Sequence, residues 1–513
     1  MNGDLSRVTF NPLNHFTSIV LQQGRVQMDA DGNEQAAILL HYLRGLAADL
    51  IGQHGGPDDL FGNQAARTGL QERNCGFALV AASGTATAPD FSLNPELLES
   101  EKQALKKALG DGRLPLVITT GRYYVDGLRS ENETAWQYSE QPYLKRADDE
   151  EIMRKPNATY LLYLDVWERF VSAMDDPSIR EVALGGADTA ARTKLIWQVR
   201  IAPEQIAAPP NNCTDFNLPW PAEMKKLFGA NRGVMKAWTK GSEGTGDDEV
   251  CITSPEARFR GLENQLYRVE IHRGGPALGV TNREPAATFK WSRNNATTSV
   301  AVKEKNGDRL VVSGLRDLSR WFEVGNWVEL THDALELNGL PGTMVRLAKV
   351  EGEVLTIDPD TTSGTIYEPD SDFDDLPIRN LKVRLWDHKQ PEARNADDET
   401  ALQDGAIPVE EGVELDLEDG IKILFERDAA VPARYVSGDY WLIPARVATG
   451  DVEWPREEVE DTGENAKKDA AKLLPPHGVT HHYAPLAALT LAAGKVTKIV
   501  DLRHKFTPLA VCK

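Results

Sequence analysis

Lys194–Ile201 reads KLIWQVRI, in which the apolar Leu195, Trp197, Val199 and Ile201 alternate with residues that include the polar Lys194, Gln198 and Arg200. Successive side chains of a strand point to opposite sides of a sheet, so this alternation is typical of a strand with one buried face. Tyr267–Ile271 and Phe289–Trp291 show the same alternation. The sequence therefore predicts a mainly β fold built from half-buried strands.

Similar short runs occur throughout the chain, bounded by Gly, Pro, Asn and Asp. They lie at Gly121–Gly127, Tyr160–Trp167, Gly352–Asp358 and Asp439–Ile443. Runs of this length separated by turn residues favour antiparallel pairing. We therefore expect a mainly β, multidomain chain with an N-terminal helix (α+β) and several small antiparallel sheets or barrels.

Two stretches have helical spacing. In Asn33–Ile51 apolar residues recur every three or four positions, Asp31 and Glu34 resemble a capping box, and Gly52 supplies the stop. The preceding segment, Thr17–Met28, is expected to be an extended arm. A second helix is predicted for Pro95–Leu109.

Composition suggests four consecutive parts. We expect an arm and helix at 1–60, a first β-rich domain at 61–210, a Pro, Gly and Asp-rich linker at 211–256, and a second β-rich domain at 257–513. A small barrel is expected as an insertion at about 307–382. The acid-rich residues 397–419 are expected to form a solvated loop or sheet edge.

The charge balance limits the possible partners. The chain has 513 residues, with 57 Lys and Arg against 78 Asp and Glu, so its formal net charge is −21. Nucleic acid requires a basic face, so it is not expected as a partner. No apolar run reaches the roughly 18 residues of a membrane helix. Met1–Phe10 lacks a signal pattern. We expect cytoplasmic synthesis without a signal peptide and no direct membrane insertion.

Three histidines offer a candidate metal site. His477, His481 and His482 are close in sequence and could share a transition metal, with Asp501 or His504 completing the set. No fixed ligand spacing accompanies them, and the Pro-rich turn around them favours a structural role. Asp29, Asp31 and Asn33 copy the start of a calcium loop, but its later ligands are missing, so a helix cap is favoured. No cofactor is expected.

The sequence contains no phosphate loop, dinucleotide fingerprint or nucleophile elbow. An enzyme is therefore not expected. A carbohydrate-active or glycan-binding protein stays open as an alternative, because its two carboxylates need no local motif. That alternative requires a groove lined by Trp167, Trp197, Trp291 or Trp441.

Thr9–Gln35 (TFNPLNHFTSIVLQQGRVQMDADGNEQ) resembles the start of an uncharacterised domain family of phage tail-like contractile injection systems. Further blocks similar to that family follow in order: Leu164–Arg169, Ile179–Thr193, Phe259–His272, Ala287–Asn294, Gly438–Pro455 (GDYWLIPARVATGDVEWP) and Pro475–Pro485 (PPHGVTHHYAP). Gly32 stands where the family pattern has a Trp.

The resemblance implies a structural subunit of a contractile tail particle, at the baseplate or where a fibre attaches. Other tail or baseplate proteins would be its partners, and symmetry implies a homo-oligomer in a cytoplasmic or lysis-released particle. Docking would use the arm and the stripe Leu39, Leu43, Leu46 and Leu50. The alternative is that this stripe packs on the chain's own first sheet.

Overall fold

The computed structural model describes residues 3–58, 75–94, 97–142, 157–205, 213, 232–239, 258–281, 283–314, 318–369, 371–373, 376–389, 402–427, 433–460 and 467–507. The chain forms two compact units. Unit 1 contains Met1–Asp4, Phe170–Arg192 and Lys225–Val479; unit 2 contains Leu5–Arg169, Thr193–Met224 and Thr480–Lys513. Each unit therefore joins distant parts of the sequence, whereas composition suggests consecutive domains. Most of the expected linker at 211–256 lies outside the described residues.

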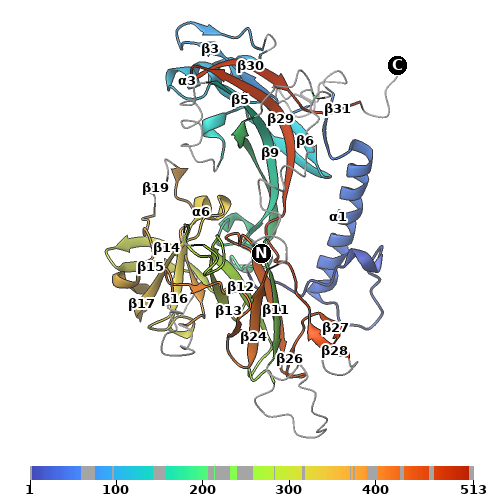
Figure 1. Cartoon of the computed structure of the whole chain (residues 1–513), viewed down its shortest axis with the longest axis vertical. Helices are drawn as coiled ribbons and strands as arrows, with labels where there is room; N and C mark the ends of the chain where they lie inside the picture. Colours follow the sequence, from blue (N-terminus) through green and yellow to red (C-terminus); the bar gives the residue numbers. More distant parts are fainter. Residues whose placement is uncertain are drawn as a thin grey trace. The chain divides into compact units, whose positions relative to one another are not determined.

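Unit 2 is organised by two long strands. β9 (Asn157–Val171) pairs antiparallel with β29 (His481–Ala492), and the two run side by side in Figure 1. They are the central strands of a sheet in the order β10-β9-β29-β30, with β10 at Arg192–Gln205 and β30 at Lys495–Asp501. The strand predicted at Lys194–Ile201 is confirmed as part of β10. This pairing explains why the C-terminal residues belong with the first β-rich region.

Two further sheets complete the unit 2 core. One has the order β31-β1-β6-β7, with bounds Lys505–Phe506, His54–Pro57, Gly121–Val125 and Leu128–Asn132. The other has the order β2-β5-β8, with bounds Leu79–Ala81, Leu116–Ile118 and Trp136–Gln137. A short hairpin joins β3 (Ser83–Gly84) and β4 (Pro89–Asp90). Their inward side chains share one apolar core with β9 and β29.

The described helices differ from the predictions mainly at their starts. α1 is Asp29–Ile51 and α3 is Glu99–Gly110, with a short α6 at Asp333–Leu337 in unit 1. The helix predicted from Pro95 begins later because the Glu101 carboxylate accepts the Leu98 backbone N–H at 2.9 Å and caps the chain there. Short 3₁₀ turns occur at Pro12–Asn14, Tyr138–Glu140, Pro177–Ile179, Val182–Leu184, Leu318–Arg320 and Pro359–Thr361. None of the described helices is both long and apolar enough to cross a membrane.

Unit 1 contains two sheets that pack through aromatic side chains. The five-stranded sheet has the order β22-β13-β12-β25-β26, with bounds Ile407–Pro408, Thr288–Ser292, Gln265–Arg273, Tyr440–Arg446 and Asp451–Val452. The three-stranded sheet has the order β11-β24-β23, with bounds Val234–Thr239, Ile421–Glu426 and Glu414–Asp416. The ring of Phe425 lies 5.1 Å from that of Phe289 and 5.6 Å from that of Trp441. These rings belong to the apolar core of unit 1.

The strands predicted at Tyr267–Ile271 and Phe289–Trp291 are confirmed as parts of β12 and β13. Their expected half-burial is wrong, because all of β13 and most of β12 are buried on both faces. Within the acid-rich stretch 397–419, residues 397–401 lie outside the described residues. The rest includes β23, which is an edge strand of its sheet.

A closed barrel forms the rest of unit 1. Its strands follow the order β14-β15-β18-β17-β16-β21, with bounds Ser299–Asn306, Arg309–Ser313, Val354–Asp358, Thr343–Glu351, Trp327–Thr331 and Lys382–Trp386. The barrel expected at 307–382 is thus larger, because β21 pairs with both β14 and β16 and closes it. Apolar side chains fill its interior. Two hairpins lie outside it, β19-β20 (Asp372–Phe373, Leu376–Pro377) and β27-β28 (Arg456–Glu460, Lys467–Ala471).

Candidate functional site

The start of α1 is set by Asp31. Its carboxylate accepts the backbone N–H of Met28 at 3.0 Å, so Asp31 caps the helix from its third residue and α1 begins at Asp29. The prediction that the helix begins at Asn33 is therefore four residues too late. Gly52 ends α1 with φ of +91°, as the sequence predicts. Asp29, Asp31 and Asn33 lie in helical backbone, which agrees with a cap and not with a calcium loop.

One face of α1 packs on unit 2. Ile38 is fully buried, and Arg44, Ala48 and Ile51 are half-buried on the same side. Arg44 forms an ion pair of 2.7 Å with Glu168 of β9. The turn after β6 also approaches closely, since a Cβ on Gly127 would lie 2.2 Å from the backbone oxygen of Arg44. These contacts attach the helix to the rest of unit 2, and none of the residues that make them belongs to the leucine stripe.

The leucine stripe faces away from these contacts. Leu39, Leu43, Leu46 and Leu50 are 54%, 61%, 57% and 64% exposed. Leu40 and Tyr42 beside them are also exposed. Within the described residues, no sheet of the chain covers the stripe, so the alternative that it packs on the chain's own first sheet is not supported.

The arm, defined here as Leu5–Met28, runs back along the start of α1. Ser6 donates to Asp29 and Thr9 donates to Glu34, and the Ser6 hydroxyl lowers the pKa of Asp29. The backbone N–H of Ile19 donates to the side-chain oxygen of Gln35 at 2.7 Å. The Phe10 and His41 rings lie 5.6 Å apart. The arm is therefore attached to the helix along several positions.

The arm and α1 together carry most of the exposed apolar surface. Thirteen of the 22 large apolar side chains that are exposed in the described residues fall between residues 8 and 50. We call this set the arm–helix surface; it comprises Val8, Leu13, Phe16, Val20, Leu21, Val26, Met28, Leu39, Leu40, Tyr42, Leu43, Leu46 and Leu50. Such a concentration of apolar side chains marks an interaction site more often than a solvated surface.

The three candidate metal histidines have separate partners. His481 Nδ1 lies 2.6 Å from Asp165, and His482 Nδ1 lies 2.9 Å from Asp126. These two residues are neighbours in β29, so their side chains point to opposite faces of the sheet. His477 belongs to unit 1, where its backbone pairs with Tyr440 and its ring lies 5.6 Å from the Tyr440 ring. His481 and His482 therefore do not converge on one site, and each of the three histidines has a partner of its own.

Asp501 and His504, proposed to complete the set, are also engaged elsewhere. Asp501 pairs with Arg503 at 2.7 Å. The His504 ring lies 4.6 Å from that of His54.

The tryptophans proposed to line a glycan groove are core residues. Trp291 and Trp441 are buried in the unit 1 core, whereas Trp167 is buried in unit 2. Trp197 packs against the unit 2 core, with its ring 4.9 Å from Phe77 and its indole N–H donating to the Glu131 backbone oxygen. These four side chains do not form the groove that the glycan alternative requires.

Sequence reasoning missed a buried charge network in unit 1, between the five-stranded sheet and the barrel. Lys290 of β13 lies 2.6 Å from Glu329 of β16 and 3.3 Å from Glu270 of β12. Arg268 contacts the other oxygen of Glu270 at 2.5 Å. Burial alone would raise the pKa of Glu270, but Arg268 and Lys290 hold it below its ordinary value. Two carboxylates thus face two cations.

Glu329 joins this network to the barrel. Its carboxylate also accepts the Trp386 indole N–H at 3.0 Å and the Gly342 backbone N–H at 3.1 Å. Burial opposes its charge, yet Lys290 and the neighbouring His272 hold the pKa of Glu329 well below its ordinary value. The charged form is therefore the one for which this site is built.

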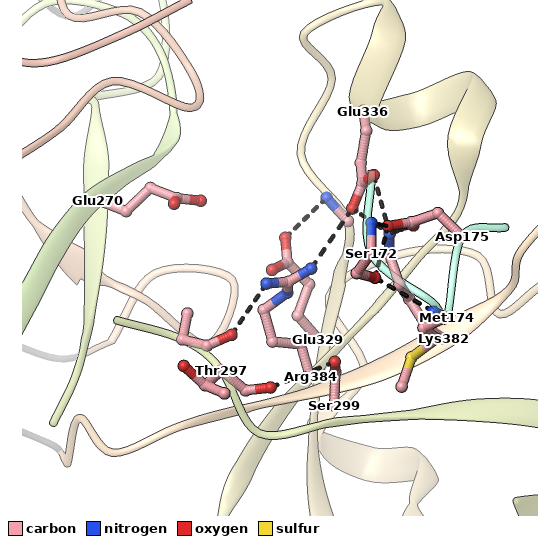
Figure 2. A network of polar contacts seen from close by, with 12 residues as sticks. Ser172, Met174, Asp175, Glu270, Thr297, Ser299, Glu329, Glu336, Lys382 and Arg384 are labelled. Carbon is pink, nitrogen blue, oxygen red and sulfur yellow. Dashed lines mark hydrogen bonds and ion pairs between the residues drawn. The ribbon is translucent and has the colours of Figure 1, made fainter. Parts of the chain in front are cut away.

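A second cluster lies beside the first (Figure 2). The carboxylates of Asp175 and Glu336 converge on the ammonium group of Lys382, at 2.8 and 2.9 Å. Asn380 donates to Asp333 at 2.9 Å. Among the described residues, Asp175, Asp333 and Glu336 are the group of acids close enough to hold a metal ion, with oxygens within 4.8 Å. Lys382 already supplies a positive charge to two of them, so this cluster has a structural explanation.

The signal that could have located the first network is the pairing of opposite charges across neighbouring strands. Glu270 lies directly opposite Lys290 in the β12–β13 register, and Glu329 opposite Arg384 in the β16–β21 register. Opposite charges in such positions stabilise a sheet pair. Sequence alone does not give these registers.

The sequence matches DUF6519, described as a family of unknown function, over residues 1–68, 102–213 and 233–499. The match includes the arm, α1 and most of both units. No curated protein and no solved structure matches the chain.

Proposed function

Because the chain belongs to the DUF6519 family, whose function is unknown, we propose its role from its own surface. The chain is a structural subunit of a phage tail-like contractile injection particle, located at the baseplate or where a fibre attaches. It docks through the arm–helix surface onto neighbouring subunits of that particle. The sequence resemblance of Thr9–Gln35 and the later blocks supports the type of particle.

The observation that carries this proposal is the exposed arm–helix surface. A free monomer would leave more than half of its exposed large apolar side chains within residues 8–50 in contact with water. Burying these side chains against a neighbour is favourable, at about 25 cal/mol for each Å² removed from water. The extended arm adds backbone groups that can pair with a neighbouring sheet.

The buried charge clusters support the same role. Glu270 and Glu329 face Arg268 and Lys290 inside unit 1, and this network joins the barrel to the five-stranded sheet. A rigid connection of this kind suits a subunit of an assembly. The glycan-binding alternative has less support, because its four tryptophans pack into cores.

Deletion of Leu5–Met28 with α1 left intact tests the docking role. We expect a folded chain that is depleted from purified particles relative to the sheath protein, because the attached arm supplies half of the surface. A matched variant with Leu262→Glu, which changes a 99% exposed leucine outside the surface, should enter particles normally. Normal incorporation of the deletion variant would contradict this role of the arm.

A further inference from the structure

The exposed stripe of α1 has the spacing of a coiled-coil seam. Ala36, Leu39, Leu43, Leu46 and Leu50 are separated by three, four, three and four residues, which corresponds to a and d positions of two heptads. All five are exposed. We call these five residues the seam.

The face of α1 that packs on unit 2 is the back of this seam. Arg44 and Ile51 occupy b positions, Ile38 a c position and Ala48 an f position. In a coiled coil these positions face away from the partner helix. The helix is therefore held on its own unit by the side that a coiled coil does not use, with the a and d side chains presented outward.

The residues flanking the seam indicate what covers it. In a parallel pair of identical helices, g residues face the next e residues, which brings Gln35 next to Leu40 and Tyr42 next to Ala47. These four side chains are uncharged, so two copies of α1 meet without like charges at the seam. Selection of a different helix normally uses charged e and g residues. The charged residue of α1 at these positions is Asp49, a g position whose facing e position lies beyond the end of the helix at Ile51.

We propose that the seam is covered by α1 of a second copy of this chain, so that the subunits self-associate through a short helical coiled coil. This inference rests on the proposed function and deepens it: the seam joins copies, and the arm is left for other tail proteins. Since no a position holds a β-branched residue, the seam does not restrict the assembly to two strands.

The seam is short, and the chain carries a net charge of −21, which makes separate copies repel one another. Salt screens this repulsion and does not weaken apolar contacts. Self-association is therefore expected to strengthen with protein concentration and with salt.

Sedimentation velocity of the purified full-length chain, alone and over a range of concentrations and salt, tests the proposal. One chain has a mass of 56.6 kDa. We expect a multiple of this mass for the wild type and the single-chain mass for a variant with Leu43→Glu and Leu46→Glu. The control Leu184→Glu, at a leucine that is 66% exposed and outside the seam, should sediment like the wild type.

Circular dichroism should show unchanged secondary structure in the seam variant, because both leucines are exposed. If the double Glu variant is unfolded, Leu43→Ala with Leu46→Ala retains helix propensity and should weaken association in the same direction. A wild type that stays at the single-chain mass under all conditions would overturn the proposal, as would an oligomer that survives in the seam variants. Neither result depends on particles, so incorporation into particles is judged separately.

Discussion

Ile38 and Leu43 lie on opposite faces of α1. Ile38 is fully buried against unit 2, whereas Leu43 is 61% exposed in the middle of the seam. The two side chains have similar size and hydrophobicity, so the difference between them is one of position. The same helix therefore has one face that stabilises the fold and another that is free for a partner.

Replacement of these two residues by alanine should separate the two faces. Ile38→Ala should lower the free energy of unfolding by about 2–5 kcal/mol, because it leaves a cavity in a packed interface. Leu43→Ala should change it by less than about 0.5 kcal/mol, as for other surface positions. Urea denaturation of both variants under monomeric conditions measures the difference. Equal losses would show that the seam is packed within its own chain.

Lys290→Met should destabilise unit 1 strongly. The change removes the cation that faces Glu270 and Glu329, and loss of one partner of a buried charge pair costs about 3–5 kcal/mol. Lys303→Met, at an exposed lysine of β14, should stay within about 0.5 kcal/mol of wild type. Thermal and urea denaturation would measure both. A loss for Lys290→Met as small as for Lys303→Met would mean that the network carries no net stabilisation.

The strands were predictable where a local alternation of apolar side chains identifies them. The alternating apolar residues of Lys194–Ile201 pack against a core and suffice to identify β10, although Ile196 and Gln198 on its other face are buried as well. The start of α1 was harder to predict, because an Asp can cap a helix either as the residue that precedes it or, like Asp31, as its third residue. Both arrangements use the same residue types, so the sequence alone does not choose between them.

The charge network was not predictable from the sequence. Arg268 and Glu270 alternate with apolar residues, which indicates a solvent-exposed face. The barrel covers that face, and it brings Glu329 to Lys290 from 39 residues away. Burial of a charged face depends on such long-range contacts, whereas periodicity reports only the local pattern. Likewise, the spacing of the leucines in the stripe is the same whether the stripe packs on its own chain or is exposed, so the sequence did not predict its exposure.

His388 should make stability depend on pH. Burial lowers its pKa from the ordinary 6.5 to about 4, and the ring stays neutral while Nε2 donates to the Gly405 backbone oxygen at 2.7 Å. In the unfolded chain the His388 side chain takes up a proton below pH 6.5, whereas in the folded chain it does so only near pH 4. The stability that depends on neutral His388 is therefore complete above pH 6.5 and is lost as the pH falls to about 4.

The variant His388→Gln should therefore lose less stability than wild type between neutral pH and pH 5, by about 2 kcal/mol. Urea denaturation at the two pH values measures this difference. His15→Gln, at an exposed residue of the arm, is the control. The same pH dependence in wild type and His388→Gln would contradict the assignment.

Two glycines near the α1 contact should respond in opposite directions to alanine. A Cβ on Gly45 meets nothing within 4 Å, so Gly45→Ala should raise stability by about 0.5–1 kcal/mol through helix propensity. Gly127 has φ of +78° and touches the backbone of Arg44, so Gly127→Ala should lower stability by at least about 1–3 kcal/mol. Calorimetry of the two variants tests this. A stabilising Gly127→Ala would show that α1 does not pack on the turn after β6.

The most direct test of the particle role is quantitative mass spectrometry of sedimenting particles purified from the producing cells. We predict that the chain is recovered with sheath and tube proteins in a fixed ratio through successive purification steps. A chain that remains in the soluble fraction, or whose ratio to the sheath falls with each step, would contradict the role as a structural subunit.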